Sequence, residues 1–145
     1  MSLANYEPIR ETVTSRRGAH EFSVRGLSLD DVVVLFNKHM TDVNRLFDLI
    51  SAKDVNSDTL SEGVSIASRL VSEAPEVAAR VIALACDEPE LYAKARKITI
   101  PLQIEIIRRV VELTFDEAGG ARNFQLSFQT MAAAMAAKKP TASNI

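Results

Sequence analysis

The stretch SLDDVVVLFNKHMTDVNRLFDLI, residues 28–50, decides the fold class of this chain. Ser28 is a good helix N-cap, because its hydroxyl can accept a hydrogen bond from a free backbone N–H in the first turn. Asp30 and Asp31 add negative charge at the positive end of the helix dipole. Behind this cap, apolar residues recur at gaps of three and four, the period of one helical face: Leu29, Val32, Phe36, Met40, Val43, Phe47 and Ile50. Such a helix must be covered by the rest of the chain or by a partner.

Length and composition limit the classes of protein to which the chain can belong. Its 145 residues are 47% hydrophobic and 25% charged, which is ordinary for one soluble globular domain. The net charge of −2 provides no overall field to attract nucleic acid or anionic lipid. No apolar run approaches the ~20 residues that span a bilayer, and the first residues lack a signal-peptide pattern. We therefore expect neither a nucleic-acid partner nor a membrane segment.

The residues before the long helix are expected to be extended. Residues 1–10 show no periodicity and are predicted to be a loose N-terminus. Residues 11–26 carry β-branched and alternating apolar residues around the turn-like stretch at Gly18, which predicts a short β arm or hairpin. Gly18 can supply a positive φ in that turn. Because an isolated hairpin is marginal in water, Phe22 and Val24 should rest on the helical body.

Residues 28–138 are predicted to form the helical body. Proline costs no hydrogen bond at the first positions of a helix, so prolines mark three helix starts: Pro75, Pro89 and Pro101. The second of these helices is expected to run to Ile98, and the third to end at Gly119. Residues 139–145 are expected to fray. The sequence predicts a mostly α single domain over residues 1–145, with about five or six helices and a short N-terminal β arm or hairpin.

The chemistry-bearing residues do not form the pattern of a catalytic or metal site. Three carboxylates cluster beside Cys86: Asp87, Glu88 and Glu90. They would form either a metal or acid–base site or the usual charges at a helix start, and the lack of nearby histidine favours the second interpretation. His20 and His39 each stand without a nucleophile or second ligand. Cys86 follows an apolar run and is expected to be a buried small hydrophobe. We expect no enzyme activity and no cofactor or metal.

The remaining charged residues are expected to be structural or solvated. Glu105 lies three and four residues before Arg108 and Arg109, the spacing of helical ion pairs. Other basic residues are scattered and not interleaved with aromatics, which favours a solvated surface: Arg16, Arg17, Arg25, Lys94, Arg96, Lys97, Lys138 and Lys139. A helix-turn-helix over residues 75–97 fits by length alone. It supports the alternative function, a small helical DNA-binding regulatory protein.

The last predicted helix, residues 121–138, carries a stripe of aromatic and methionine side chains on an alanine-rich surface. The stripe comprises Phe124, Phe128, Met131 and Met135. It is either core packing or a contact surface for a partner. Because methionine adapts its shape, such a surface suits an irregular or partly unfolded client. The sequence therefore names these four residues as candidate partner-binding residues.

Two runs resemble a known family. Residues 22–31, FSVRGLSLDD, resemble the opening of the tail assembly chaperones of long-tailed bacteriophages, also called pre-tape-measure chaperones. In that family, a short extended segment leads through a V-R-G-L-S-type turn into a first helix with acids in its first turn. Residues 83–107, from ALACDEPE to IPLQIEII, are similar to the family's second half, with Gln103 near the start of a helix. The likeness covers most of residues 22–115.

The resemblance implies a function without catalysis. Such a protein binds the tape measure protein, keeps it soluble, and promotes assembly of the tail tube around it. It acts in the host bacterial cytoplasm and is absent from the mature virion. The resemblance also implies contact with the major tail tube protein and a longer form made by ribosomal frameshifting, for which Lys138-Lys139 is compatible with an A-rich slippery site. Self-association into a homo-oligomer is expected, since apolar surface that awaits a client can pair with itself.

Overall fold

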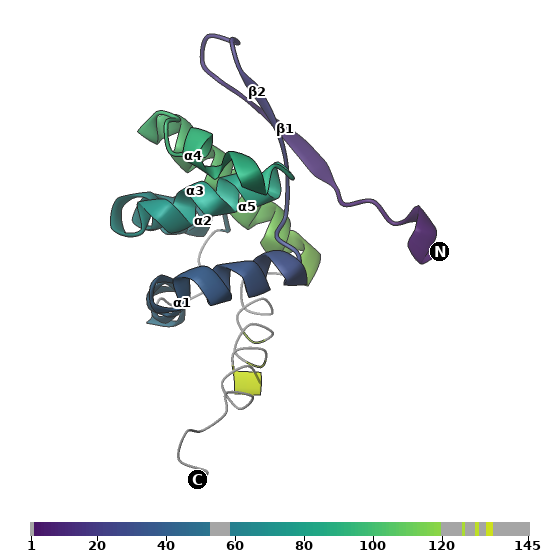
Figure 1. The fold of residues 1–145 in the computed structure, drawn as a ribbon, viewed down its shortest axis with the longest axis vertical. Coiled ribbons are helices and arrows are strands. Elements are labelled where there is room, and N and C mark those ends of the chain that lie inside the picture. Colours follow the sequence, from purple (N-terminus) through teal and green to yellow (C-terminus); the bar gives the residue numbers. More distant parts are fainter. Residues whose placement is uncertain (1, 53–58, 120–125, 127–129, 131–132, 135–145) are drawn as a thin grey trace.

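The computed structural model describes residues 2–52, 59–119, 126, 130, 133 and 134, and their side chains except those of 45–52, 59–63, 117 and 118. Within these residues, Figure 1 shows a helical body from which a β-hairpin projects. The helices are α1 (Leu29–Ala52), α2 (Thr59–Glu73), α3 (Pro75–Ala85), α4 (Tyr92–Ala95) and α5 (Ile100–Ala118). The strands are β1 (Arg10–Thr14) and β2 (Glu21–Arg25), and short 3-10 turns occupy Leu3–Asn5 and Pro89–Leu91. The predicted mostly α fold with an N-terminal hairpin is confirmed.

The hairpin packs on the helical body as expected. Strands β1 and β2 pair antiparallel, with Val13 opposite Phe22 and Glu11 opposite Val24. Gly18 has a φ of +68° in the turn, the conformation for which glycine was expected there. Val13 and Val24 are buried, Phe22 packs against the core, and both strands contact α5. One face of this small sheet is therefore covered by α5.

Helix α1 begins at the predicted cap but is not straight. Val32, Phe36 and Val43 are buried as expected, whereas Leu29 is 65% and Met40 36% exposed. The backbone is non-helical at His39 (φ −140°, ψ 41°). This kink rotates the following turn, which explains why Met40 leaves the buried face. At the start of α1, Leu27 packs against the core in place of Leu29. The side chains of Phe47 and Ile50 lie outside the described ones.

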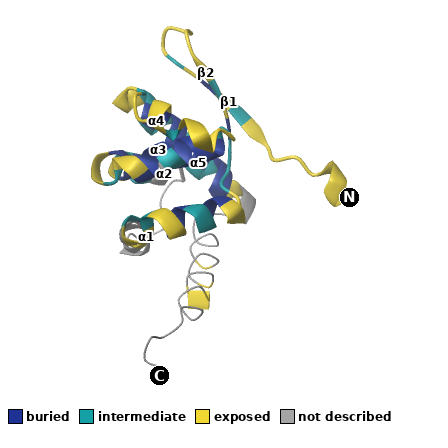
Figure 2. Ribbon diagram, in the orientation of Figure 1, coloured by how far each residue is buried: buried dark blue, intermediate teal, exposed yellow. Residues whose placement is uncertain are grey.

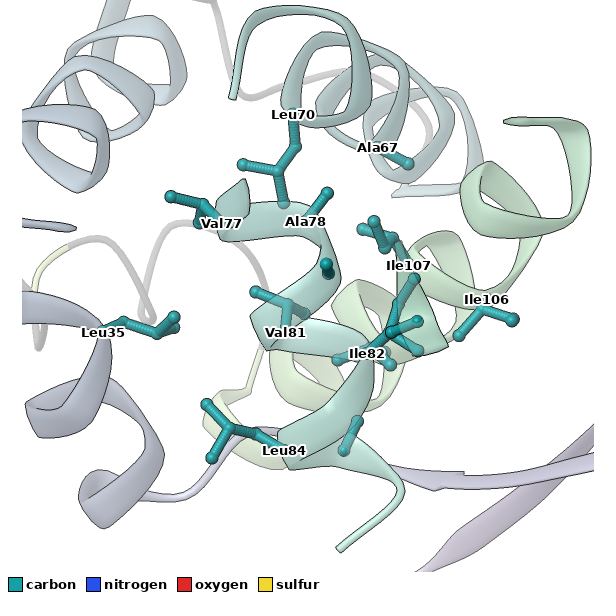
Figure 3. Close-up of a cluster of buried hydrophobic side chains, with 14 of the residues drawn as sticks. Leu35, Ala67, Leu70, Val77, Ala78, Val81, Ile82, Leu84, Ile106 and Ile107 are labelled. Carbon is teal, nitrogen blue, oxygen red and sulfur yellow. The ribbon is translucent and has the colours of Figure 1, made fainter. Parts of the chain in front are cut away.

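The centre of the body is α3, and not the long α1 from which the sequence argument started. Every residue from Val77 to Ala85 except Arg80 is buried, and Figure 2 shows α3 dark blue among the other elements. Helix α3 contacts α1, α2, α4, α5 and β2. In Figure 3, Ile82 points toward Ile106 and Ile107 of α5. The alanines of α3 allow these contacts, because small side chains let neighbouring helices approach closely.

Three of the predicted helix ends are confirmed, and the predicted length of one helix is wrong. Pro75 starts α3, Pro101 lies in the first turn of α5, and Gly119 closes α5 with a φ of +86°. The chain after Pro89 does not form one helix to Ile98: a 3-10 turn precedes the four-residue α4. The predicted helix over residues 121–138 lies outside the described residues except for isolated positions.

Candidate functional site

The motif that carries the family resemblance is built around the guanidinium group of Arg25. Arg25 is the last residue of the hairpin strand β2, with a side chain only 12% exposed. It donates to Asp31 of α1 (Nη1–Oδ2, 2.6 Å), to the Leu84 carbonyl of α3 (Nη2–O, 3.0 Å) and to Asp87 (Nη2–Oδ1, 2.8 Å). One side chain therefore ties the hairpin, the start of α1 and the end of α3 together. We call these four residues the Arg25 hub.

Asp87 belongs to this hub because of an unusual backbone conformation. Helix α3 ends in a Schellman arrangement, in which the N–H of Glu88 donates to Ala83 and that of Asp87 to Leu84. Asp87 takes the left-handed position of this motif, with a φ of +59°, where glycine is usual. Glycine at this position would lack the carboxylate to which Arg10 and Arg25 both bind. Of the three carboxylates after Cys86, Asp87 therefore forms ion pairs with Arg10 and Arg25, which the sequence did not predict.

The turn between β2 and α1 also contacts α5. Ser28 and Asp31 form a capping box: the Ser28 hydroxyl accepts from the Asp31 N–H (3.2 Å), and the Asp31 carboxylate accepts from the Ser28 N–H (2.7 Å). The N–H of Leu27 donates to Thr114 Oγ1 of α5 (2.9 Å). A Cβ built on Gly26 would lie 3.0 Å from the backbone N of Thr114. Glycine is favoured here because a Cβ would crowd the α5 backbone.

Gly26→Ala is expected to destabilise the fold by about 1–3 kcal/mol, because the added methyl group pushes against helical backbone that cannot rotate away. The hydrogen bond from Leu27 to Thr114 should open, so the Leu27 amide should exchange faster with solvent. Hydrogen exchange monitored by NMR measures this. The matched control is Gly18→Ala, which introduces strain at a positive φ but meets no atom within 4 Å. An unchanged Leu27 amide in Gly26→Ala would contradict the close contact.

Gln103, which the resemblance placed near the start of a helix, contacts the segment between α4 and α5. Its side chain is buried, and its Nε2 donates to the carbonyls of Ala95 (3.1 Å) and Ile98 (2.9 Å). The Ala95 carbonyl also accepts from the Ile98 N–H (3.3 Å). Gln103 therefore pairs backbone carbonyls in the segment that follows the single turn of α4.

The charged face of α5 is an ion-pair network, as its spacing predicts. Arg108 binds Glu105 and Glu112, and Arg109 binds Glu105 as well as Glu11 of β1. The hydrogen bond from Arg108 lowers the pKa of the Glu105 carboxyl below its ordinary value, against the opposing effect of burial. These residues stabilise α5 and its contact with the hairpin.

Cys86 is half-buried at the C-cap of α3 and packs against the core. Burial, and then the neighbouring Glu88 carboxylate, raises the pKa of its thiol. A raised thiol pKa lowers the thiolate fraction and hence the reactivity at neutral pH. His39 accepts a hydrogen bond from Arg80 (Nε–Nε2, 3.0 Å), whereas His20 is exposed on the hairpin. Across the part of the chain that the structure describes, no group of three or more His, Cys, Asp and Glu residues could hold a metal ion.

Four of the basic residues that are scattered in the sequence line one groove in the structure. Arg16 and Arg17 come from the hairpin turn, and Lys94 and Lys97 come from α4 and the segment after it; all four are exposed. The groove has a volume of about 890 Å³. Its floor is apolar and partly buried: Phe22, Ile98 and Leu102. We call this the cationic groove. In Figure 1 the hairpin turn and α4, which supply these cations, both lie in the upper part of the molecule.

A second groove shares Ile98 with the cationic groove as a lining residue. It runs between α2, the start of α3 and the start of α5, with a volume of about 520 Å³. Val71, Ile100 and Ile104 are among its apolar residues, and Ile100 is 64% exposed. Both grooves are open clefts with apolar side chains, the form of surface that accepts a segment of another chain.

The four candidate partner-binding residues of the sequence argument, Phe124, Phe128, Met131 and Met135, all lie outside the described residues. Their role stays a prediction. The cationic groove was missed because its cations come from segments about 80 residues apart, and nothing local pairs them. A helix-turn-helix over residues 75–97 is not what the structure has: α3 is buried and α4 spans only four residues. No described helix is long and apolar enough to cross a bilayer.

Comparison with known proteins relates the chain to one family. A family model described as pre-tape measure protein matches residues 1–145. No curated protein and no solved structure gives a match. The match includes residues 22–31 and 83–107, the two runs on which the resemblance rested. The chain therefore belongs to the pre-tape measure protein family, which places it among phage tail-related proteins associated with the tape measure protein.

Proposed function

We propose that this protein is a bacteriophage tail assembly chaperone that binds the tape measure protein and keeps it soluble while the tail tube assembles around it. The observation that carries the proposal is the match of the whole chain to the pre-tape measure protein family. On this proposal the protein acts by contact alone, in the host cytoplasm, and leaves before the virion is complete.

The described surface supports binding of a protein segment. The Arg25 hub, Gln103 and the α5 ion pairs are used internally, holding the hairpin and the α4–α5 segment in place. The grooves beside these elements are open and have apolar floors. A rigid helical scaffold with open apolar clefts can hold apolar helices of a client without catalysing any reaction.

Co-expression tests this function. The cognate tape measure protein, produced alone, is expected to be largely insoluble; produced with this chain, it should be soluble and co-purify with it. The measurement is the soluble fraction and the composition of the affinity-purified material. Phe128→Asp, analysed in the same assay, tests the predicted stripe of the last segment. A tape measure protein whose solubility does not change, and which forms no complex with this chain, would refute the chaperone function.

A further inference from the structure

We propose that the cationic groove is the docking site for an acidic amphipathic segment of the tape measure protein, an inference that rests on the proposed chaperone function. The segment would place its apolar side chains on Phe22, Ile98 and Leu102 and its carboxylates beside the cations of the rim. The inference names a surface and a chemistry of recognition that the family match does not supply.

The rim of the cationic groove carries positive charge that is not paired with carboxylates among the described residues. Among the ion pairs of the described residues, none involves Arg16, Arg17, Lys94 or Lys97. The other arginines with described side chains each have a carboxylate, histidine or aromatic partner. The lining of the groove contains no Asp or Glu. In a chain of net charge −2, this is a local concentration of positive charge, and it attracts an anionic partner.

The floor of the cationic groove is apolar. Phe22, Ile98 and Leu102 are each partly buried against the core, so they are held in place but still line the groove. A partner that brought only charge would leave these side chains exposed to water. An amphipathic segment covers them and pairs the rim charges at the same time. Nucleic acid fits less well, since two of the three floor residues are aliphatic and cannot stack on bases.

The last residues of this chain match the groove poorly in charge. Residues 120–145 contain Arg122, Lys138 and Lys139 but no Asp or Glu. Like charges at close range repel, so this basic segment is a poor match for a cationic rim. An acidic segment from a different chain satisfies both the rim and the floor.

Charge reversal in the full-length protein tests the inference. The variant Arg16→Glu/Arg17→Glu should weaken binding of purified tape measure fragments by about tenfold or more, because the rim would then repel the carboxylates. Wild-type binding should weaken as salt is raised, and the variant should lose most of this salt dependence. The control is Lys38→Glu/Arg69→Glu, which changes the net charge equally at two exposed positions outside the groove and removes only the exposed Arg69–Glu73 ion pair. Calorimetry measures affinity, and circular dichroism checks that each variant is folded.

The outcomes separate this inference from the function on which it rests. If the wild type binds no tape measure fragment, the proposed function is refuted. If the wild type binds but the groove variant and the control bind equally well, the docking site is refuted and the function stands. Binding of duplex DNA or self-association that the groove variant alone abolishes, with tape measure binding unchanged, would assign the groove to a different occupant. Synthetic peptides from the bound fragment should lose affinity when Glu is replaced by Gln.

Discussion

Arg25→Met is expected to lower the free energy of unfolding by about 3–5 kcal/mol, the usual result of removing one partner from a buried ion pair. The Asp31 side chain is 7% exposed, so its carboxylate would lose its cationic partner in a poorly solvated place. The carbonyl of Leu84 would lose a donor as well. Methionine retains much of the aliphatic volume of arginine, so the loss reports mainly on charge and hydrogen bonding. Urea denaturation followed by circular dichroism measures it.

Arg10→Met is the matched control. Arg10 binds the same Asp87 carboxylate, but its side chain is 38% exposed. Exposed ion pairs contribute about 0–1 kcal/mol, so this variant should be nearly as stable as the wild type. An equal loss of unfolding free energy in the two variants would mean that Arg25 contributes no more than an exposed ion pair, which would contradict the hub.

A double variant separates the ion pair from the packing. Arg25→Met/Asp31→Asn removes both charges and keeps an acceptor for the Ser28 N–H. It should therefore be more stable than Arg25→Met alone, with a coupling energy of about 0.5–3 kcal/mol between the two positions. A double variant that is less stable than the single one would show that the uncompensated Asp31 charge is not the cause of the loss.

Ile107→Ala is expected to cost about 2–5 kcal/mol, because it leaves a cavity where α5 meets the central helix α3. Ile107 is 0% exposed and lies beside Ile82 in Figure 3. The matched control on the same helix is Ile100→Ala, whose side chain is 64% exposed and which should change stability by only about 0.5 kcal/mol. Urea denaturation of both variants measures the difference, and similar values would contradict a core centred on α3.

Local patterns in the sequence predict much of this fold. The cap at Ser28, the hairpin turn at Gly18, the helix start at Pro75 and the end at Gly119 depend on a few neighbouring residues, so they can be inferred without the rest of the chain. The predicted helix after Pro89 is replaced by a 3-10 turn and the four-residue α4, and Gln103 binds the carbonyls of Ala95 and Ile98.

The candidate site was less predictable than the fold. Sequence spacing identified the ion pairs of α5, since both partners lie within one helical turn. Spacing could not predict the ion pair between Arg25 and Asp87, or the groove that Arg17 and Lys94 share, because the residues of each pair are more than 60 positions apart. The family resemblance selected the run around Arg25 without a physical reason. The structure supplies one, since that run connects β2, α1, α3 and α5.

By itself, the sequence determined that the chain is mostly α, that a hairpin precedes the helices, and which family it resembles, because helical periodicity, capping and short motifs are local. Only the tertiary structure decided that α3 is the centre of the helical body. It also decided that the run around Arg25 connects β2 to α1, α3 and α5, and that four cations line one groove with an apolar floor. Burial and charge depend on which segments meet in space, and those meetings are set by the packing of the whole chain.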